Sequence, residues 1–120
     1  MFAINKAGNT VDIKINNVQG KAIIDSGAAV SIISKDFVDN HKLKVLAFNG
    51  TGYKLANGKL YKPLGQCKIK LNLMLEQKTK ECELNIFVCD GLPVDVLIGF
   101  NLIKEFGIII DGSQDRIYFS

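Results

Sequence analysis

One aspartate of this sequence stands in a setting that suits hydrolytic chemistry. Asp25 follows an apolar run and precedes a hydroxyl residue and a glycine, within residues 23–28 (IIDSGA). The apolar run predicts a buried strand, and Gly27 permits a sharp turn with close backbone approach, which would carry the carboxylate from the core into a cleft. Such a carboxylate activates a water molecule for peptide hydrolysis when a second carboxylate shares its proton.

The sequence contains a single segment of this kind, and that number constrains the architecture. Hydrolysis by paired carboxylates requires the chain to associate with a second copy of itself, and otherwise the chain is inert. The tripeptide alone also suits a simpler role, in which Asp25 caps a turn or accepts a hydrogen bond from a backbone amide. The remaining aspartates lack this context and are expected at the surface or in turns: Asp12, Asp36, Asp39, Asp90, Asp95, Asp111 and Asp115.

Short strands are predicted on both sides of Asp25. Alternating apolar residues at positions 11, 13 and 15 predict a first strand, residues 16–20 supply turn chemistry, and a second strand is expected over 21–25. Residues 30–34 continue as a buried strand. A short helix is then expected to begin at Ser34 or Lys35 and to end at Asn40.

The second half of the chain also predicts mainly strands. Asn57-Gly58 lies between alternating apolar residues, which predicts a projecting hairpin over residues 53–61. Two half-buried strands are expected over 69–75 and 84–88, on either side of a polar turn at 77–80. An apolar strand over 94–99 and a helix over 101–106, which ends at Gly107, should follow. Short strands are expected last, over 108–110 and 116–119.

Length and composition indicate one all-β domain over residues 1–120. The chain is 48% apolar and its Val- and Ile-rich runs are short and closely spaced, which favours strands. A chain of 120 residues can bury a real core, although a domain of this size keeps a modest stability margin. Association with a second copy would add to that margin.

Charge and cysteine content argue against several classes of function. The net charge of +3 comes from scattered lysines, with Arg116 as the only arginine, so we expect no nucleic-acid partner. The three cysteines lack zinc-like spacing and His41 lies far from them, so free thiols are expected and no metal site. Neither a signal peptide nor a membrane span is predicted, which favours an intracellular, cytoplasmic protein without a membrane partner, or a segment cut from a longer precursor.

Three segments in this order resemble the retropepsins, the single-domain aspartic proteases of retroviruses and LTR retrotransposons. They are residues 23–34 (IIDSGAAVSIIS), the Asn-Gly hairpin at 55–58 with Gly65 after it, and residues 96–103 (VLIGFNLI). The similarity runs from about Val11 to Phe119. It implies an all-β, retropepsin-like acid-protease fold: a small closed β-barrel with a flap hairpin and one short C-terminal helix, active as a homodimer. The hairpin and the helix resemble retrotransposon members and their cellular relatives more than lentiviral enzymes.

The resemblance also implies roles for individual residues. Asp25 would be the catalytic carboxylate, with Ser26 and Gly27 as active-site support. The implied substrate-binding positions lie in the loop after Asp25, in the flap and on the second apolar strand: Gly27, Ala28, Ala29, Val30, Ala56, Asn57, Gly58 and Leu97. No cofactor or metal is called for.

By this resemblance the protein is a homodimeric aspartic endopeptidase that hydrolyses extended apolar segments of polypeptides through a water activated by paired aspartates. A retroelement polyprotein is the expected substrate, and the cytoplasm, including virus-like particles, is the expected location. Two alternatives stay open. One is a catalytically silent retropepsin-fold module for dimerisation or peptide binding, and the other is a cellular retropepsin domain of the ubiquitin-shuttle type.

The sequence departs from lentiviral members at two linked positions. Those enzymes carry an acidic residue at the position of Ala29 and an arginine at the position of Phe100, which form an ion pair. An apolar contact between Ala29 and Phe100 is expected to replace it. The apolar terminal segments, residues 2–4 and 117–119, are expected either to interleave between two subunits or to complete each subunit's own sheet.

Overall fold

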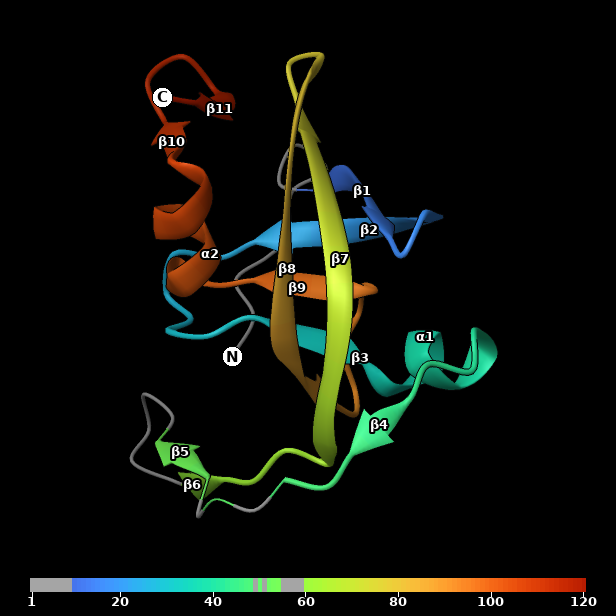
Figure 1. Cartoon of the computed structure of the whole chain (residues 1–120). Coiled ribbons are helices and arrows are strands. Elements are labelled where there is room, and N and C mark those ends of the chain that lie inside the picture. The colour runs from blue at the N-terminus through green and yellow to red at the C-terminus, as the bar shows by residue number, and fades with distance from the viewer. Residues whose placement is uncertain (1–9, 49, 51, 55–59) are drawn as a thin grey trace.

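The computed structural model describes residues 10–48, 50, 52–54 and 60–120, and its architecture is a closed β-barrel (Figure 1). Six of the described strands follow one another in the order β1-β2-β9-β3-β8-β7, and β1 closes the ring by pairing with β7. They are β1 (Thr10–Ile15), β2 (Val18–Ile24), β3 (Ile32–Ser34), β7 (Gly65–Leu75), β8 (Lys78–Cys89) and β9 (Val96–Ile98). The expected all-β barrel is therefore confirmed.

Two tight turns connect the long antiparallel pairs. Asn16 and Asn17 join β1 to β2 with φ of 50° and 70°, and Glu76 and Gln77 join β7 to β8 with φ of 49° and 68°. Two-residue turns with positive φ match the twist of the flanking strands. The longer turns predicted at 16–20 and 77–80 are wrong, because the strands resume directly after these two residues.

Two short helices follow the predicted positions. α1 (Lys35–Asn40) begins after Ser34, whose hydroxyl accepts a hydrogen bond from the backbone N of Asp36 at 3.1 Å. α2 (Phe100–Phe106) begins one residue earlier than predicted and ends at Gly107, which adopts the left-handed conformation with φ of 70°.

The main core fills the barrel. Strand alternation sends every second side chain inward, so that β7 buries its odd-numbered residues from Gly65 to Leu75. α2 covers part of the barrel with three buried side chains, Leu102, Ile103 and Phe106. Each large apolar side chain buried in this way contributes on the order of 1.5–3 kcal/mol, so the barrel is a stable support for the loops at its ends.

Outside the ring of six strands, β4 (Val45–Leu46) is added to the barrel sheet, whereas β5 (Tyr53–Lys54) and β6 (Leu60–Tyr61) form a separate two-stranded sheet. β4 pairs with β7, and β5 pairs with β6. The β5–β6 pair confirms the predicted hairpin in its stem, while its tip at residues 55–59, which contains Ala56, Asn57 and Gly58, lies outside the described residues.

The end of the chain folds back on itself. β10 (Ile108–Asp111) pairs with β11 (Arg116–Phe119) along all four residues, as a sheet separate from the barrel. Figure 1 shows this hairpin and the β5–β6 hairpin at opposite ends of the long strands β7 and β8. The C-terminal strand thus pairs within its own chain, and residues 2–4 lie outside the described residues. Neither helix in the described part of the chain is long and apolar enough to cross a membrane.

Candidate active site

Asp25 lies directly after β2, where the barrel backbone fixes its position. β2 pairs in parallel with β9, and the backbone N of Asp25 extends this pairing by donating to the Ile98 carbonyl at 2.9 Å. The backbone N of Ala28 then donates to the Asp25 carbonyl at 3.2 Å, which closes a tight turn. We call residues 25–31 the Asp25 loop.

The carboxyl group of Asp25 is buried and only half satisfied. The residue is 5% exposed, and its Oδ1 accepts a hydrogen bond from the Gly27 N at 2.9 Å. Its buried Oδ2 has no hydrogen-bond partner among the described residues. Burying a polar oxygen without a partner is costly, so native structures rarely do so without a functional reason. The carboxyl group therefore keeps one buried oxygen to which no described residue donates a hydrogen bond.

The Asp25 loop also provides acceptors for the N-terminus of α2. Phe100 N donates to the Ala28 carbonyl at 2.7 Å and Asn101 N donates to the Ala29 carbonyl at 3.3 Å. The first amides of a helix have no partner within the helix, and Gly99 at the N-cap has no side chain to supply one. The carbonyls of the loop take over this role, so the loop and α2 hold each other in place.

Gly99 is required for this close packing. A Cβ atom at this position would lie 2.4 Å from the Val30 carbonyl oxygen and 2.8 Å from the Ala28 carbonyl oxygen. Both atoms belong to the backbone and cannot rotate away. The glycine that ends the second apolar strand therefore allows that strand to lie against the Asp25 loop.

Two positioning residues were missed by the sequence analysis. Ser31 is 3% exposed, and its Oγ accepts from the Gly99 N at 2.9 Å and donates to Asn101 Oδ1 at 2.8 Å. The hydroxyl thus connects the end of the Asp25 loop to the first turn of α2. The available signal was a lone hydroxyl residue within the apolar run at 30–33, and an asparagine directly after Gly99-Phe100.

A small apolar cluster packs on the side of the strands opposite to the main core. Ile24 points into the barrel, so strand alternation places the preceding residue, Ile23, on the other face. We name this group the outer cluster. Its buried members are Ile23, Ile32, Cys89 and Leu97, and its half-buried members are Ala28, Phe87, Leu92 and Val94. Two of the expected substrate-binding residues thus belong to one apolar cluster: Leu97 is a buried member, and Ala28 packs against it.

The other expected site residues lie in two places. Ser26, Gly27 and Ala29 are exposed on the Asp25 loop, and Val30 is half-buried. A Cβ on Gly27 would lie 3.2 Å from Asp25 Oδ1, so this glycine lets the backbone approach the carboxyl. The flap positions Ala56, Asn57 and Gly58 lie outside the described residues.

The other reactive groups in the described part of the chain do not form a competing site. The described cysteines form no disulfide, and burial raises the pKa of the thiols of Cys67 and Cys82, which keeps them protonated and weakly nucleophilic. Within the described ranges, no three His, Cys, Asp or Glu side chains gather closely enough to hold a metal ion.

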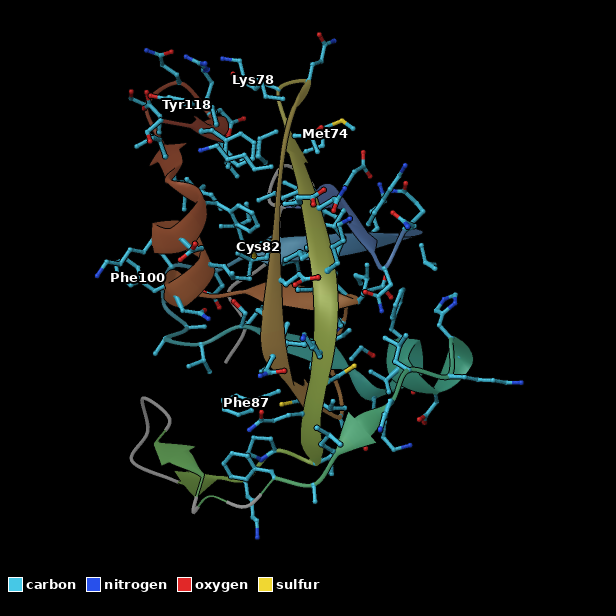
Figure 2. The ribbon with its side chains drawn as sticks, in the orientation of Figure 1. Met74, Lys78, Cys82, Phe87, Phe100 and Tyr118 are labelled. Carbon is cyan, nitrogen blue, oxygen red and sulfur yellow. The ribbon has the colours of Figure 1, made fainter. Side chains whose placement is uncertain are left out.

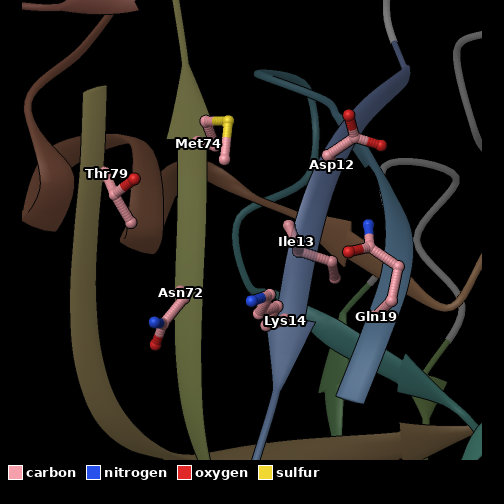
Figure 3. Close-up of a pocket in the computed structure, with 7 residues that line it drawn as sticks. All are labelled: Asp12, Ile13, Lys14, Gln19, Asn72, Met74 and Thr79. Carbon is pink, nitrogen blue, oxygen red and sulfur yellow. The ribbon is translucent and has the colours of Figure 1, made fainter. Parts of the chain in front are cut away.

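A pocket is formed by residues of four barrel strands, none of which belongs to the Asp25 loop. Figure 3 shows its lining on four strands, β1, β2, β7 and β8: Asp12, Ile13, Lys14, Gln19, Asn72, Met74 and Thr79. None of the expected site residues that the structure describes lines it, so the pocket is distinct from the described part of the candidate site.

Comparison with known proteins places this geometry in context. The family model for gag-polyprotein aspartyl proteases matches residues 11–105. No curated protein gives a significant match to the sequence.

Several solved structures share the fold. The retroviral protease-like domain of Ddi1 from Leishmania major is 22% identical with a TM-score of 0.63, over 92% of this chain and 86% of that one. A retropepsin-like aspartic protease from Rickettsia conorii is 25% identical with a TM-score of 0.55, over 90% and 78%. The EIAV protease complexed with the inhibitor HBY-793 is 15% identical with a TM-score of 0.51, over 82% and 86%.

Proposed function

Because the chain belongs to the retropepsin-type family of gag-polyprotein aspartyl proteases, we propose that it is an aspartic endopeptidase that works as a homodimer. The observation that carries this proposal is the burial of Asp25, a residue that is 5% exposed and whose Oδ2 has no partner among the described residues. A second Asp25 is the group that completes such a site, because one buried carboxyl can share a proton with another.

The proposed mechanism uses the two Asp25 carboxyls as a unit. Two like charges at contact distance cannot both ionise cheaply, so one carboxyl keeps its proton and the other is ionised. A water between them loses a proton to the ionised carboxylate and attacks the scissile carbonyl carbon. The protonated carboxyl donates a hydrogen bond to the carbonyl oxygen, and the pair then protonates the leaving nitrogen.

The neighbouring residues have supporting roles in this proposal. Ser26 braces the two loops at the subunit boundary, and the Gly27 carbonyl accepts from the substrate backbone. The outer cluster, with Leu97 and Ala28, supplies an apolar wall for side chains beside the scissile bond. The β5–β6 hairpin is the proposed flap, which would cover an extended peptide and exclude water during the reaction.

A retroelement polyprotein is the proposed substrate. The family description, which refers to gag polyproteins, supports this class. The fold shared with the protease-like domain of Ddi1 from Leishmania major keeps a cellular substrate as the second candidate. If the protein cleaves a gag-type polyprotein in preference to ubiquitin-linked proteins, the retroelement polyprotein is supported as the substrate and the cellular substrate is not.

Asp25→Asn is the variant that tests the proposed activity. Wild type and variant are incubated with a library of apolar decapeptides between about pH 4 and 7, with the oligomeric state measured at the assay concentration. We expect cleavage by the wild type and none by Asp25→Asn. Absence of cleavage by a wild type shown to be dimeric would contradict the proposal and favour a binding module.

A further inference from the structure

Asp95 directly precedes β9 and connects it to two other strands. Its backbone N donates to the Lys21 carbonyl at 3.1 Å, and its own carbonyl accepts from the Ser34 N at 2.8 Å. These bonds lie at the ends of the β2–β9 and β3–β9 pairings. Figure 1 shows the three strands side by side, with β9 between β2 and β3. Asp95 thus holds β9 in place where its pairing with β2, the strand that leads to Asp25, begins.

The Asp95 side chain makes a further bond to β2. Its Oδ2 accepts a hydrogen bond from the Lys21 N at 2.9 Å, whereas the Lys21 side chain pairs with Asp12. The Asp95 carboxyl group therefore binds the backbone of β2 and not the charge of the lysine. A contact of this kind depends on how the two strands are aligned, because the backbone amide cannot move independently of its strand.

Gly20 makes room for this carboxyl group. A Cβ atom at Gly20 would lie 3.1 Å from Asp95 Oδ2 and 3.6 Å from the Asp95 Cβ. Gly20 is the only glycine of β2, so one position of the strand offers this room. Gly20 and Asp95 therefore fit together in one register of β9 on β2.

The rest of the β2–β9 ladder is short and apolar on both faces. Three residue pairs make up this ladder: Ala22–Val96, Ile23–Leu97 and Ile24–Ile98. All of them are buried, partly in the main core and partly in the outer cluster, so the alternation of apolar and polar residues does not select a register here. A slip by one residue would move Leu97 from the outer cluster to the opposite face.

The same register places the Asp25 loop. At the other end of the ladder, the Asp25 N donates to the Ile98 carbonyl at 2.9 Å, and Gly99 then passes close to two carbonyl oxygens of the loop. A shift of β9 by one residue would bring a residue with a Cβ atom to the place of Gly99, so the loop would have to move. The position of Asp25 therefore depends on the contact between Asp95 and β2.

We propose that Asp95 is a positioning residue for Asp25, because its carboxyl group, packed against Gly20, fixes the register of β9 on β2. Asp95 acts through the ladder and touches no reacting atom. This inference rests on the proposed function where cleavage is measured, and on the fold alone where the register is measured. A catalytic group displaced by about 1 Å can lower a rate about a hundredfold, so a small shift of the ladder has a large effect.

Three variants and a matched control test this role. Asp95→Ala removes the acceptor, Asp95→Asn keeps an oxygen atom in its place, and Gly20→Ala crowds the carboxyl group. Asp111→Ala is the control, because the Asp111 carboxyl also accepts from two backbone amides, at 3.0 and 3.3 Å. Asp111 belongs to the β10–β11 hairpin, whose Tyr118 Figure 2 shows at the Lys78 end of β8.

The first readout is the separation of kcat from KM, measured at a protein concentration that saturates the activity per chain. We expect kcat to fall about tenfold to hundredfold in Asp95→Ala, with KM within about threefold of wild type. Asp95→Asn should keep kcat within about threefold, and Asp111→Ala within about twofold. Gly20→Ala should lower kcat as well but should add little to Asp95→Ala, because both variants disturb the same contact.

Hydrogen exchange at the backbone N–H of Asp25 is the second readout and needs no activity. In Asp95→Ala and Gly20→Ala this amide should exchange about tenfold faster relative to the amides of the β7–β8 pair, which report the stability of the barrel. A general loss of stability would speed up both groups of amides alike. The ratio in Asp95→Asn and Asp111→Ala should match that of the wild type.

Three results would overturn the inference. They are an unchanged exchange ratio in Gly20→Ala and Asp95→Ala, a wild-type kcat in Asp95→Ala, and equal losses of kcat in Asp95→Ala and Asp95→Asn. If Asp95→Ala does not fold, the exchange ratio of Gly20→Ala decides. If the wild type cleaves no peptide, the proposed endopeptidase fails, and the exchange ratio still decides whether Asp95 positions Asp25.

Discussion

The two ends of α2 meet the rest of the molecule through different kinds of interaction. At its N-terminus, the contacts with the Asp25 loop are hydrogen bonds between uncharged groups, including the buried bond from Gly99 N to Ser31 Oγ. At its C-terminus, the chain continues into the β10–β11 hairpin, whose contacts with the barrel involve charged side chains at the surface.

Ile108 and Phe119 of the hairpin are buried in the main core, and two contacts of charged side chains add to this attachment. Lys80 donates from Nζ to the Phe106 carbonyl at 2.9 Å and lies 5.0 Å from the centre of the Phe119 ring. Arg116 binds both carboxylate oxygens of Glu76, at 2.9 and 2.7 Å. This ion pair lowers the pKa of Glu76 and raises that of Arg116, chiefly through its hydrogen bonds.

The difference matters because the two kinds of contact respond differently to the medium. Neutral, buried hydrogen bonds neither titrate nor suffer much from salt screening, whereas exposed ion pairs do both and contribute little. The junction between the Asp25 loop and α2 should therefore keep its geometry over a wide range of pH and salt. The attachment of the β10–β11 hairpin should weaken in acid and at high ionic strength.

The largest expected effect comes from the one carboxyl side chain in the Asp25 loop. Asp25→Asn should reduce peptide cleavage by at least about 10³-fold, because the amide cannot accept the proton of the attacking water. The free energy of unfolding should change by less than about 1 kcal/mol, since the backbone bonds of the loop remain. Cleavage assays and urea unfolding measure the two quantities. A large loss of stability would instead make Asp25 a structural residue.

Gly99→Ala should break the packing between the loop and α2. The new Cβ would meet two backbone carbonyl oxygens, at 2.4 and 2.8 Å, so we expect a loss of about 2–4 kcal/mol in the free energy of unfolding, together with lower activity. Gly112→Ala is the matched control, because a Cβ there meets nothing within 4 Å. Equal effects in urea unfolding would show that the close approach at Gly99 is unimportant.

Ser31→Ala should lower the free energy of unfolding less than Gly99→Ala does, although it affects the same junction between the Asp25 loop and α2. It leaves the buried Gly99 N without an acceptor and Asn101 Oδ1 without its donor, which should cost about 1–3 kcal/mol. Ser113→Ala, which removes an exposed hydroxyl bound to Asp111, should cost less than about 0.5 kcal/mol. Chemical denaturation gives both values, and similar losses would argue against a special role for the Ser31 hydroxyl.

Glu76→Gln should change stability least among these variants, and its effect should depend most clearly on pH and salt. The folded-state pKa of Glu76 is lowered, so its stabilisation is present above the unfolded-state pKa and is lost as the pH falls through the folded-state value. We therefore expect a slightly lower melting temperature than wild type near pH 7. The difference should vanish below about pH 3 or in about 0.5 M salt. A difference that persists under both conditions would contradict the ion-pair account.

Much of the fold followed from local patterns in the sequence. Alternating apolar residues predicted the long strands β7 and β8, and Asn-Gly predicted the hairpin whose stem is β5–β6. The turn lengths were predicted wrongly. Gly20 suggested a turn, but it lies in β2, where its missing side chain leaves room for Asp95, whose carboxylate would be 3.1 Å from a Cβ. A glycine gives the same signal in both settings, so the sequence could not separate them.

The sequence by itself determined the strand pattern, the position of Asp25 at the end of an apolar run, and the single copy of the Asp-Ser-Gly segment, on which the proposed second subunit rests. These properties depend on neighbouring residues and on residue types, which can be read directly. Only the tertiary structure decided that Ser31 bonds to Asn101, 70 positions away, and that the Asp25 Oδ2 is buried without a partner among the described residues. Contacts of this kind arise when the barrel closes and brings β2 and β9 side by side. No local pattern specifies them.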